Sequence, residues 1–87
     1  MKIKKNLIKR DIAGDVILVP TGKSVIEANG LYFLNDLGSF IWDILPGVES
    51  EEDIIKAVLD EYDADENIVR NDVALFLDKL RKLEVIE

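Results

Sequence analysis

The sequence of 87 residues predicts an α+β fold, in which a three-stranded antiparallel sheet is followed by three α-helices. Two observations predict it. Short β-prone runs separated by glycine and proline fill the chain up to about residue 34. From residue 35 onward, the apolar residues recur instead with the spacing of amphipathic helices. The length fits a single domain, residues 1–87.

The strands are expected within residues 7–34, as an antiparallel meander with tight connections. Ala13-Gly14 supplies the first turn, and Gly30 permits a bend into the last strand. Between them, residues 21–29 form either a short extra strand or a helical turn, and the sequence does not decide. The β-prone runs are Leu7–Ile12, Asp15–Val19 and Leu31–Leu34.

Three helices are expected at about residues 36–45, 51–62 and 66–83. Side chains that can accept a backbone N–H precede each one, namely Asn35 or Asp36, Ser50 and Asp65. The last two helices, joined by a tight turn, would form a helix-turn-helix, and the attached sheet makes the arrangement winged-helix-like. The expected core faces are Leu37, Phe40, Ile41, Ile44 and Leu45; Ile54, Ile55, Val58, Leu59 and Tyr62; and Val69, Val73, Phe76, Leu80 and Leu83.

Composition excludes several classes of function. The chain has no cysteine and no histidine, so disulfides, thiolate chemistry and histidine-dependent catalysis or metal binding are excluded. No apolar run approaches the ~20 residues of a membrane span, and no signal peptide is evident, so a cytoplasmic protein that does not enter membranes is expected. The net charge is −7, and residues 11–65 hold thirteen acidic residues against two lysines, which argues against nucleic-acid binding. The five basic side chains of residues 2–10 are interpreted as a solvated edge.

No active site is predicted, and neither is a cofactor or a metal. Ser24, Ser39 and Ser50 lack an activating histidine or a suitably spaced lysine, and there is no glycine-rich phosphate loop. A calcium loop starting at Asp63 would need glycine and glutamate where the chain has Ile68 and Ala74. A binding module is therefore favoured over an enzyme.

Two alternative functions stay open. Asp36-Leu-Gly-Ser39 resembles the phosphopantetheine attachment stretch of acyl carrier proteins, which are also small and acidic. However, Ser39 follows a glycine inside the first helical turn, and the residues before it are β-prone. The winged-helix-like arrangement also permits DNA binding, but residues 66–84 carry no net charge, whereas a recognition helix is basic.

The last strand and the last helix predict a groove for an extended peptide. The strand is apolar on both faces and is expected at a sheet edge, where its N–H and C=O groups would be unpaired. The last helix has a second line of residues beside its core face, with one acid and one base. A peptide added as an extra strand suits this arrangement, although both features could simply be core. The predicted peptide-binding residues are Leu31, Tyr32, Phe33, Leu34, Ile68, Asp72, Leu75, Phe76 and Lys79.

Residues 7–86 resemble the pyrroloquinoline-quinone biosynthesis protein D (PqqD) family. The resemblance rests on Leu34-Asn35, Gly38, Ile41-Trp42, Leu45, Ser50–Ile54, Tyr62-Asp63, Asp72-Val73, Phe76-Leu77, Leu80, Leu83 and Val85-Ile86, in that order and spacing. It implies a domain of three strands and three helices that recognises ribosomally made, modified peptides. The leader of a precursor peptide would dock as a strand against the third strand, beside the third helix.

The resemblance also implies a partner enzyme and a non-catalytic role. A domain of this kind presents the leader to a modifying enzyme, often a radical S-adenosylmethionine protein. A monomer is expected, with a dimer left open, and the sequence names neither the precursor, the enzyme nor the product. Two departures from the family stand out: Glu84 replaces a usual glycine near the C-terminus, and the connection over residues 21–29 is longer than in short relatives.

Overall fold

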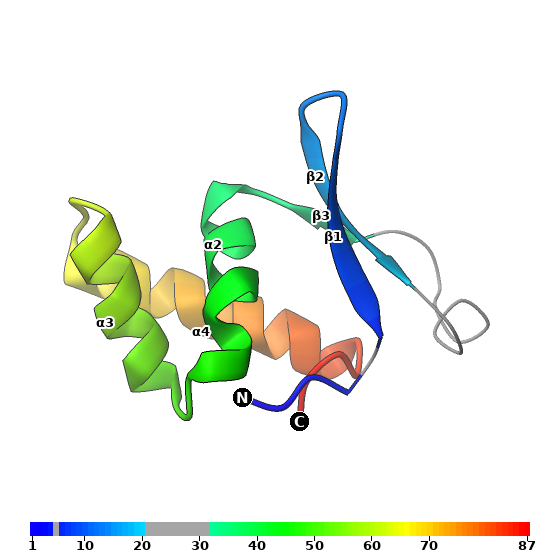
Figure 1. Cartoon of the computed structure of the whole chain (residues 1–87). Coiled ribbons are helices and arrows are strands. Elements are labelled where there is room, and N and C mark those ends of the chain that lie inside the picture. The colour runs from blue at the N-terminus through cyan, green and yellow to red at the C-terminus, as the bar shows by residue number, and fades with distance from the viewer. Residues whose placement is uncertain (5, 21–31) are drawn as a thin grey trace.

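The computed structural model describes residues 1–4, 6–20 and 32–87. The expected α+β fold, three antiparallel strands followed by three helices, is confirmed (Figure 1). The predictions for residues 21–30 and for Leu31 lie outside the described residues. The elements are β1 Leu7–Ile12, β2 Asp15–Pro20, β3 Tyr32–Leu34, α2 Asp36–Ile44, the short 3₁₀ helix η1 Leu45–Gly47, α3 Glu51–Glu61 and α4 Glu66–Lys82.

The sheet has the order β1-β2-β3 with antiparallel pairing throughout. Ala13 and Gly14 connect the first two strands and both have positive φ, 53° and 88°. A two-residue hairpin turn with positive φ at both positions matches the twist of the strands, and this fixes the register in which Ile12 faces Asp15.

The two faces of the sheet differ, although Ile17, which pairs with Phe33 and points away from the main core, is also buried. Leu18 is fully buried against the helices, and Leu34 packs against the same core. Ile8 and Ile12 on β1 and Phe33 on β3 are exposed on the opposite face. The side chains of Leu34 and Phe33 therefore point to opposite faces, as the period of two requires.

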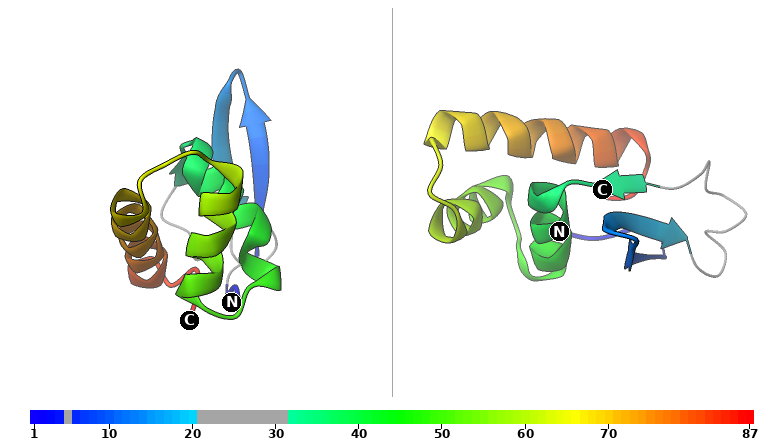
Figure 2. Two further views of the ribbon diagram at one scale, coloured as in Figure 1. Left: turned by 90° about the vertical axis from the view of Figure 1, so that its left-hand side faces the viewer. Right: turned by 90° about the horizontal axis from the view of Figure 1, so that it is seen from above.

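The core lies where α2, α3 and α4 meet the inner face of the sheet (Figures 1 and 2). The expected core face of α4 is partly wrong. Leu77 is fully buried, whereas Phe76 and Leu83 are only partly buried. Spacings of four and three residues fit either of two adjacent apolar positions, and the way α4 packs on the other helices decides between them.

The expected face of α2 also needs a correction. Trp42 is 8% exposed and belongs to the core, although the helical pattern did not include it. Phe40 is only partly buried, and its ring meets Tyr62 edge to face with the centroids 5.6 Å apart. The core side of α2 is thus rotated toward Ile41, Trp42 and Leu45.

The predicted helix starts are capped as expected. Asn35 Oδ1 accepts a hydrogen bond from the Gly38 N–H at 2.7 Å. Ser50 Oγ accepts from the Asp53 N–H, and Asp65 Oδ1 accepts from two amides of α4. Asn35 is the only residue between β3 and α2, so the strand passes into the helix with no loop.

The C-terminus of α4 closes in a Schellman motif centred on Glu84, which has φ 60°. The Val85 N–H donates to the Leu80 carbonyl at 2.8 Å, and the Glu84 N–H donates to the Arg81 carbonyl at 3.0 Å. Ile86 then bridges antiparallel to Ile3, which brings the two chain ends close together (Figure 1). None of the helices in the described part of the chain has the length and apolarity to cross a membrane.

Candidate peptide-binding groove

The outer edge of β3 has no neighbouring strand among the described residues, because β2 pairs only with its other side. Seen from above in Figure 2, β3 lies between β2 and α4 and runs in the opposite direction to both. The opposite edge of the sheet, β1, carries Lys9, Arg10 and Asp11, whereas β3 carries no charge. Charged side chains discourage strand addition, so β3 is the more receptive edge.

A pocket of about 320 Å³ opens where β3 ends, between the first turn of α2 and the middle of α4. We refer to it as the edge pocket. Its apolar wall includes Leu75, which is 62% exposed and therefore available to a ligand. Asp72 and Lys79 also line it, seven residues apart on α4. The lining residues are Asn35, Leu37, Gly38, Asp72, Leu75, Phe76 and Lys79.

Gly38 allows α2 and α4 to approach at the edge pocket. A Cβ atom at this position would lie 3.1 Å from Phe76 Cε1 and 3.1 Å from Asn35 Oδ1. Both contacts are tighter than ordinary van der Waals contact, so a side chain here would displace the ring or the cap. The Phe76 ring consequently packs over the start of α2 and lines the pocket, instead of entering the centre of the core.

A second pocket of about 340 Å³ lies beyond the first, and we refer to it as the acidic pocket. Buried Val58 and Val69 lie beneath it, and Ile68, which is 61% exposed, stands at its side. It shares Leu37 and Asp72 with the edge pocket, so the two pockets are neighbours. Its lining residues are Asp36, Leu37, Val58, Tyr62, Asp63, Ala64, Ile68, Val69 and Asp72.

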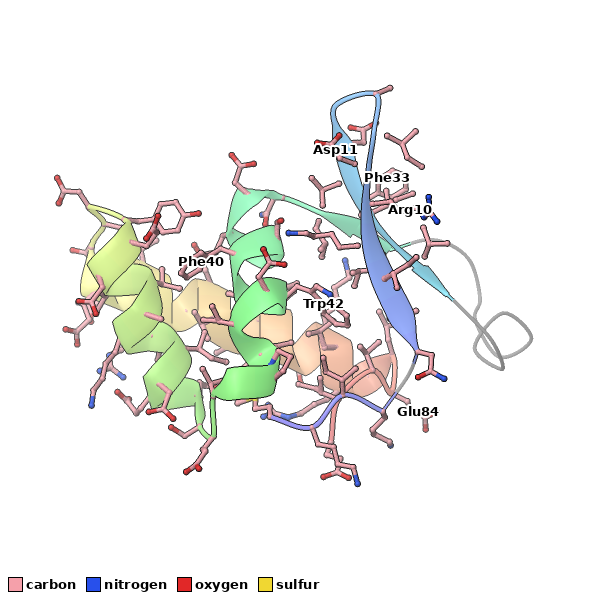
Figure 3. The ribbon with its side chains drawn as sticks, viewed as in Figure 1. Arg10, Asp11, Phe33, Phe40, Trp42 and Glu84 are labelled. Carbon is pink, nitrogen blue, oxygen red and sulfur yellow. The ribbon has the colours of Figure 1, made fainter. Side chains whose placement is uncertain are left out.

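The structure brings together the α4 members of the predicted site. Asp72, Leu75, Phe76 and Lys79 line the edge pocket, while Ile68 lines the acidic pocket with Asp72. The strand members behave differently. Leu34 packs on the core, and Phe33 points to the outer face of the sheet, near Arg10 (Figure 3). Tyr32 contributes described backbone to β3, but its side chain, like Leu31, lies outside what the structure describes.

Sequence reasoning missed the contribution of α2 and of the α3–α4 turn. Asn35, Leu37 and Gly38 line the edge pocket, and Asp36 and Asp63 line the acidic pocket. One signal was present. A glycine inside a helical pattern weakens the helix, and it often marks a close approach to a neighbouring element.

Ser39, the candidate carrier serine, is the fourth residue of α2. The Lys9 ammonium donates to its hydroxyl at 2.9 Å and pairs with the Asp43 carboxylate at 2.6 Å. The hydroxyl is therefore engaged in a contact between β1 and α2 that helps to seat the sheet on the helix.

Arg70 connects α3 to α4 on the surface of the protein and lines neither pocket. Its guanidinium hydrogen-bonds Glu52 on α3, and its Nε donates to Glu66 at 2.9 Å within α4. The hydrogen bond from Arg70 holds the pKa of Glu52 below its usual range, and the same bond raises the pKa of Arg70. Among the described residues, no group of three or more acidic side chains could hold a metal ion.

A small sheet whose last strand has an unpaired edge among the described residues, together with pockets beside the last helix, forms a candidate site for an extended peptide. The chain belongs to the PqqD family, because the family model for coenzyme PQQ synthesis protein D (PqqD) matches residues 15–86. The solved structure of TbiB1 in complex with the TbiA(beta) leader peptide is similar, with a TM-score of 0.75 and 29% identity. That similarity covers 100% of this chain and 95% of the TbiB1 chain. Comparison with curated proteins finds no match.

Proposed function

We propose that this protein is a non-catalytic peptide-binding chaperone for a ribosomally synthesised precursor. It captures the leader region of the precursor as a strand added to β3 and presents the precursor to a modifying enzyme. The observation that carries the proposal is the edge of β3 that has no partner strand among the described residues, next to the edge pocket beside α4. The similarity to TbiB1, which was solved with a leader peptide, supports it.

Two kinds of contact would hold the leader. The backbone of the guest strand pairs with the N–H and C=O groups on the outer edge of β3, each hydrogen bond adding about 0.5–1.5 kcal/mol. One apolar side chain of the leader enters the edge pocket against Leu37, Leu75 and Phe76, where full burial is worth about 1.5–3 kcal/mol. Lys79 at the margin favours a leader with an acidic residue nearby.

The enzyme partner would supply the chemistry. We propose a radical S-adenosylmethionine maturase in this role, with the present chain acting as a cytoplasmic monomer that needs neither metal nor cofactor. Two observations support this division of roles. The chain has no cysteine or histidine, and the edge pocket is lined by apolar residues, one amide side chain, one acid and one base.

Leader binding tests the proposal. The probe is a fluorescein-labelled synthetic peptide that covers the N-terminal half of the precursor encoded nearest to the gene. Fluorescence anisotropy should show saturable binding to the wild-type chain. Leu75→Ser should weaken it about tenfold, because an exposed apolar wall is lost while the core is untouched. Lys79→Glu should weaken binding of an acidic leader about three- to tenfold.

The matched control is Lys56→Glu, which makes the same change of charge on α3 at an exposed position outside both pockets. It should bind like the wild type, and circular dichroism should show all three variants folded. The peptide does not lie beside α4 if Leu75→Ser and Lys79→Glu both bind it with wild-type affinity. The same conclusion follows if Lys79→Glu and Lys56→Glu lose equal affinity.

The choice of enzyme needs a separate test. The radical S-adenosylmethionine protein encoded beside the gene should modify the precursor, detected as a mass change, only when the present chain is added. If the enzyme modifies the precursor at the same rate without the present chain, the chain does not present the precursor to this enzyme. The result for leader binding would still hold.

A further inference from the structure

The edge pocket and the neighbouring acidic pocket together form a groove along α4. Leu37 and Asp72 line both pockets, so an extended ligand that occupies the first is long enough to reach the second. We propose, building on the proposed function, that the acidic pocket takes a lysine or arginine side chain of the same leader peptide. This side chain comes from the part of the leader that precedes the strand-forming segment.

The lining of the acidic pocket selects this occupant. Its base is apolar, with Val58 and Val69 buried beneath it and Ile68 61% exposed at its side. A lysine or arginine places its aliphatic stem on such a surface and keeps its charged head at the rim. A purely apolar side chain would gain no attraction from the rim carboxylates, and an acidic one would be repelled.

The rim of the acidic pocket is negative. Asp36, Asp63 and Asp72 contribute carboxylates, and no lysine or arginine is among the lining residues. In the described part of the chain, none of the three carboxylates takes part in an ion pair. These three carboxylates do not form a metal site, because no group of three or more acidic side chains among the described residues could hold a metal ion. Tyr62 also lines the pocket and is 37% exposed, so a guanidinium in the pocket could contact its aromatic ring.

The direction of the guest strand follows from the sheet. Both existing ladders are antiparallel, and a strand that continues the pattern would run antiparallel to β3. β3 runs toward the start of α2 (Figure 2). Because the start of α2 lines both pockets, the guest passes the pockets first and β3 afterwards. The residue in the acidic pocket is therefore N-terminal to the paired segment.

The spacing along the leader can be estimated from α4. Ile68 and Lys79 mark the two ends of the groove and are separated by about 16 Å at the helical rise of 1.5 Å per residue. An extended peptide covers that distance in about five residues. A basic residue about five positions before an acidic residue is consequently the expected pattern in a good ligand.

The test uses mRNA display to select random peptides that bind each of three folded forms of the full chain. These forms are the wild type, Asp63→Lys and Asp60→Lys. Asp60 is an exposed acid on α3 that lines neither pocket, so it controls for the change in net charge. Wild-type and Asp60→Lys selections should be enriched in lysine or arginine about five residues before an acidic residue. The Asp63→Lys selection should lose that basic residue.

One selected peptide then serves as the probe in anisotropy titrations. Asp63→Lys should bind it about three- to tenfold more weakly than Asp60→Lys does, and a peptide with glutamate in place of its basic residue should reverse the order. This inference is overturned if the binding of the selected peptides depends on Leu75 but the peptides show no preference for a basic residue, or carry it after the acidic one. Either result leaves the proposed function standing. Selected ligands indifferent to Leu75→Ser would instead contradict the proposed function.

Discussion

Glu84 occupies a backbone position that suits glycine. Its φ of 60° lies in the left-handed region, where a side chain is strained, and it completes the Schellman motif at the end of α4. Glycine adopts this conformation without strain, which is the physical reason to expect it at such a position. The chain keeps the turn because Val85, which the motif positions, is fully buried.

Glu84→Gly should therefore stabilise the protein by about 1 kcal/mol, because the left-handed conformation no longer strains a Cβ atom. Urea unfolding followed by circular dichroism measures the change. Lys82→Gly, two residues earlier in α4, is the control and should destabilise by a similar amount. A loss of stability in Glu84→Gly would show that the turn does not have this geometry.

The neighbouring residues Phe76 and Leu77 divide two roles between them. Leu77 is fully buried, so Leu77→Ala should destabilise the protein by about 2–5 kcal/mol. Phe76 is partly buried and lines the edge pocket, so Phe76→Ala should destabilise by less, about 1–2 kcal/mol, and should also weaken peptide binding. Thermal unfolding of the two variants, with peptide titration of Phe76→Ala, separates these roles. Equal destabilisation, with binding intact, would place Phe76 in the core after all.

At the scale of single elements, the starts of the helices were predictable because they depend on local chemistry. Asn35, Ser50 and Asp65 accept backbone amides within three residues of themselves, and such pairs are visible in the sequence. Element type followed from the change of apolar period near residue 35. Local chemistry does not determine how far a helix is rotated about its axis, and the core roles of Trp42 and Leu77 were missed for that reason.

The candidate site was only half predictable. Its α4 residues stand at helical spacing beside the core face, so a periodic pattern reveals them. The pockets, however, also need the first turn of α2 and the α3–α4 turn, which meet α4 only after the chain has folded. No spacing in the sequence links Gly38 to Phe76, although a Cβ at Gly38 would lie 3.1 Å from that ring.

Strand β3 offers a test of the added strand through its backbone. Along an antiparallel edge strand, alternate N–H groups face the partner strand and the open side. One of Tyr32→Pro and Phe33→Pro should therefore remove an outward donor and weaken leader binding, and the other should break the ladder to β2 and unfold the sheet. Circular dichroism identifies the folded variant, and anisotropy measures its binding. If the folded variant binds like the wild type, the leader does not pair with β3.

At the scale of the whole molecule, charge is divided between the two ends of the groove. The acidic pocket lies at the α3–α4 turn, within the acid-rich middle of the chain, and Lys79 lies near the sheet. This polarity would orient a leader that has basic and acidic residues at its two ends. Its contribution to affinity should fall as salt is raised, whereas backbone pairing at β3 should be retained.

The most direct measurement of the central claim is amide hydrogen exchange by NMR, with and without the leader peptide. Pairing with a guest strand should slow exchange of the outward-facing amide of β3, while the amides of β1 at the opposite edge of the sheet should not change. Slowed exchange in β1 with β3 unaffected would contradict the account, because the peptide would then bind the charged edge and not the groove beside α4.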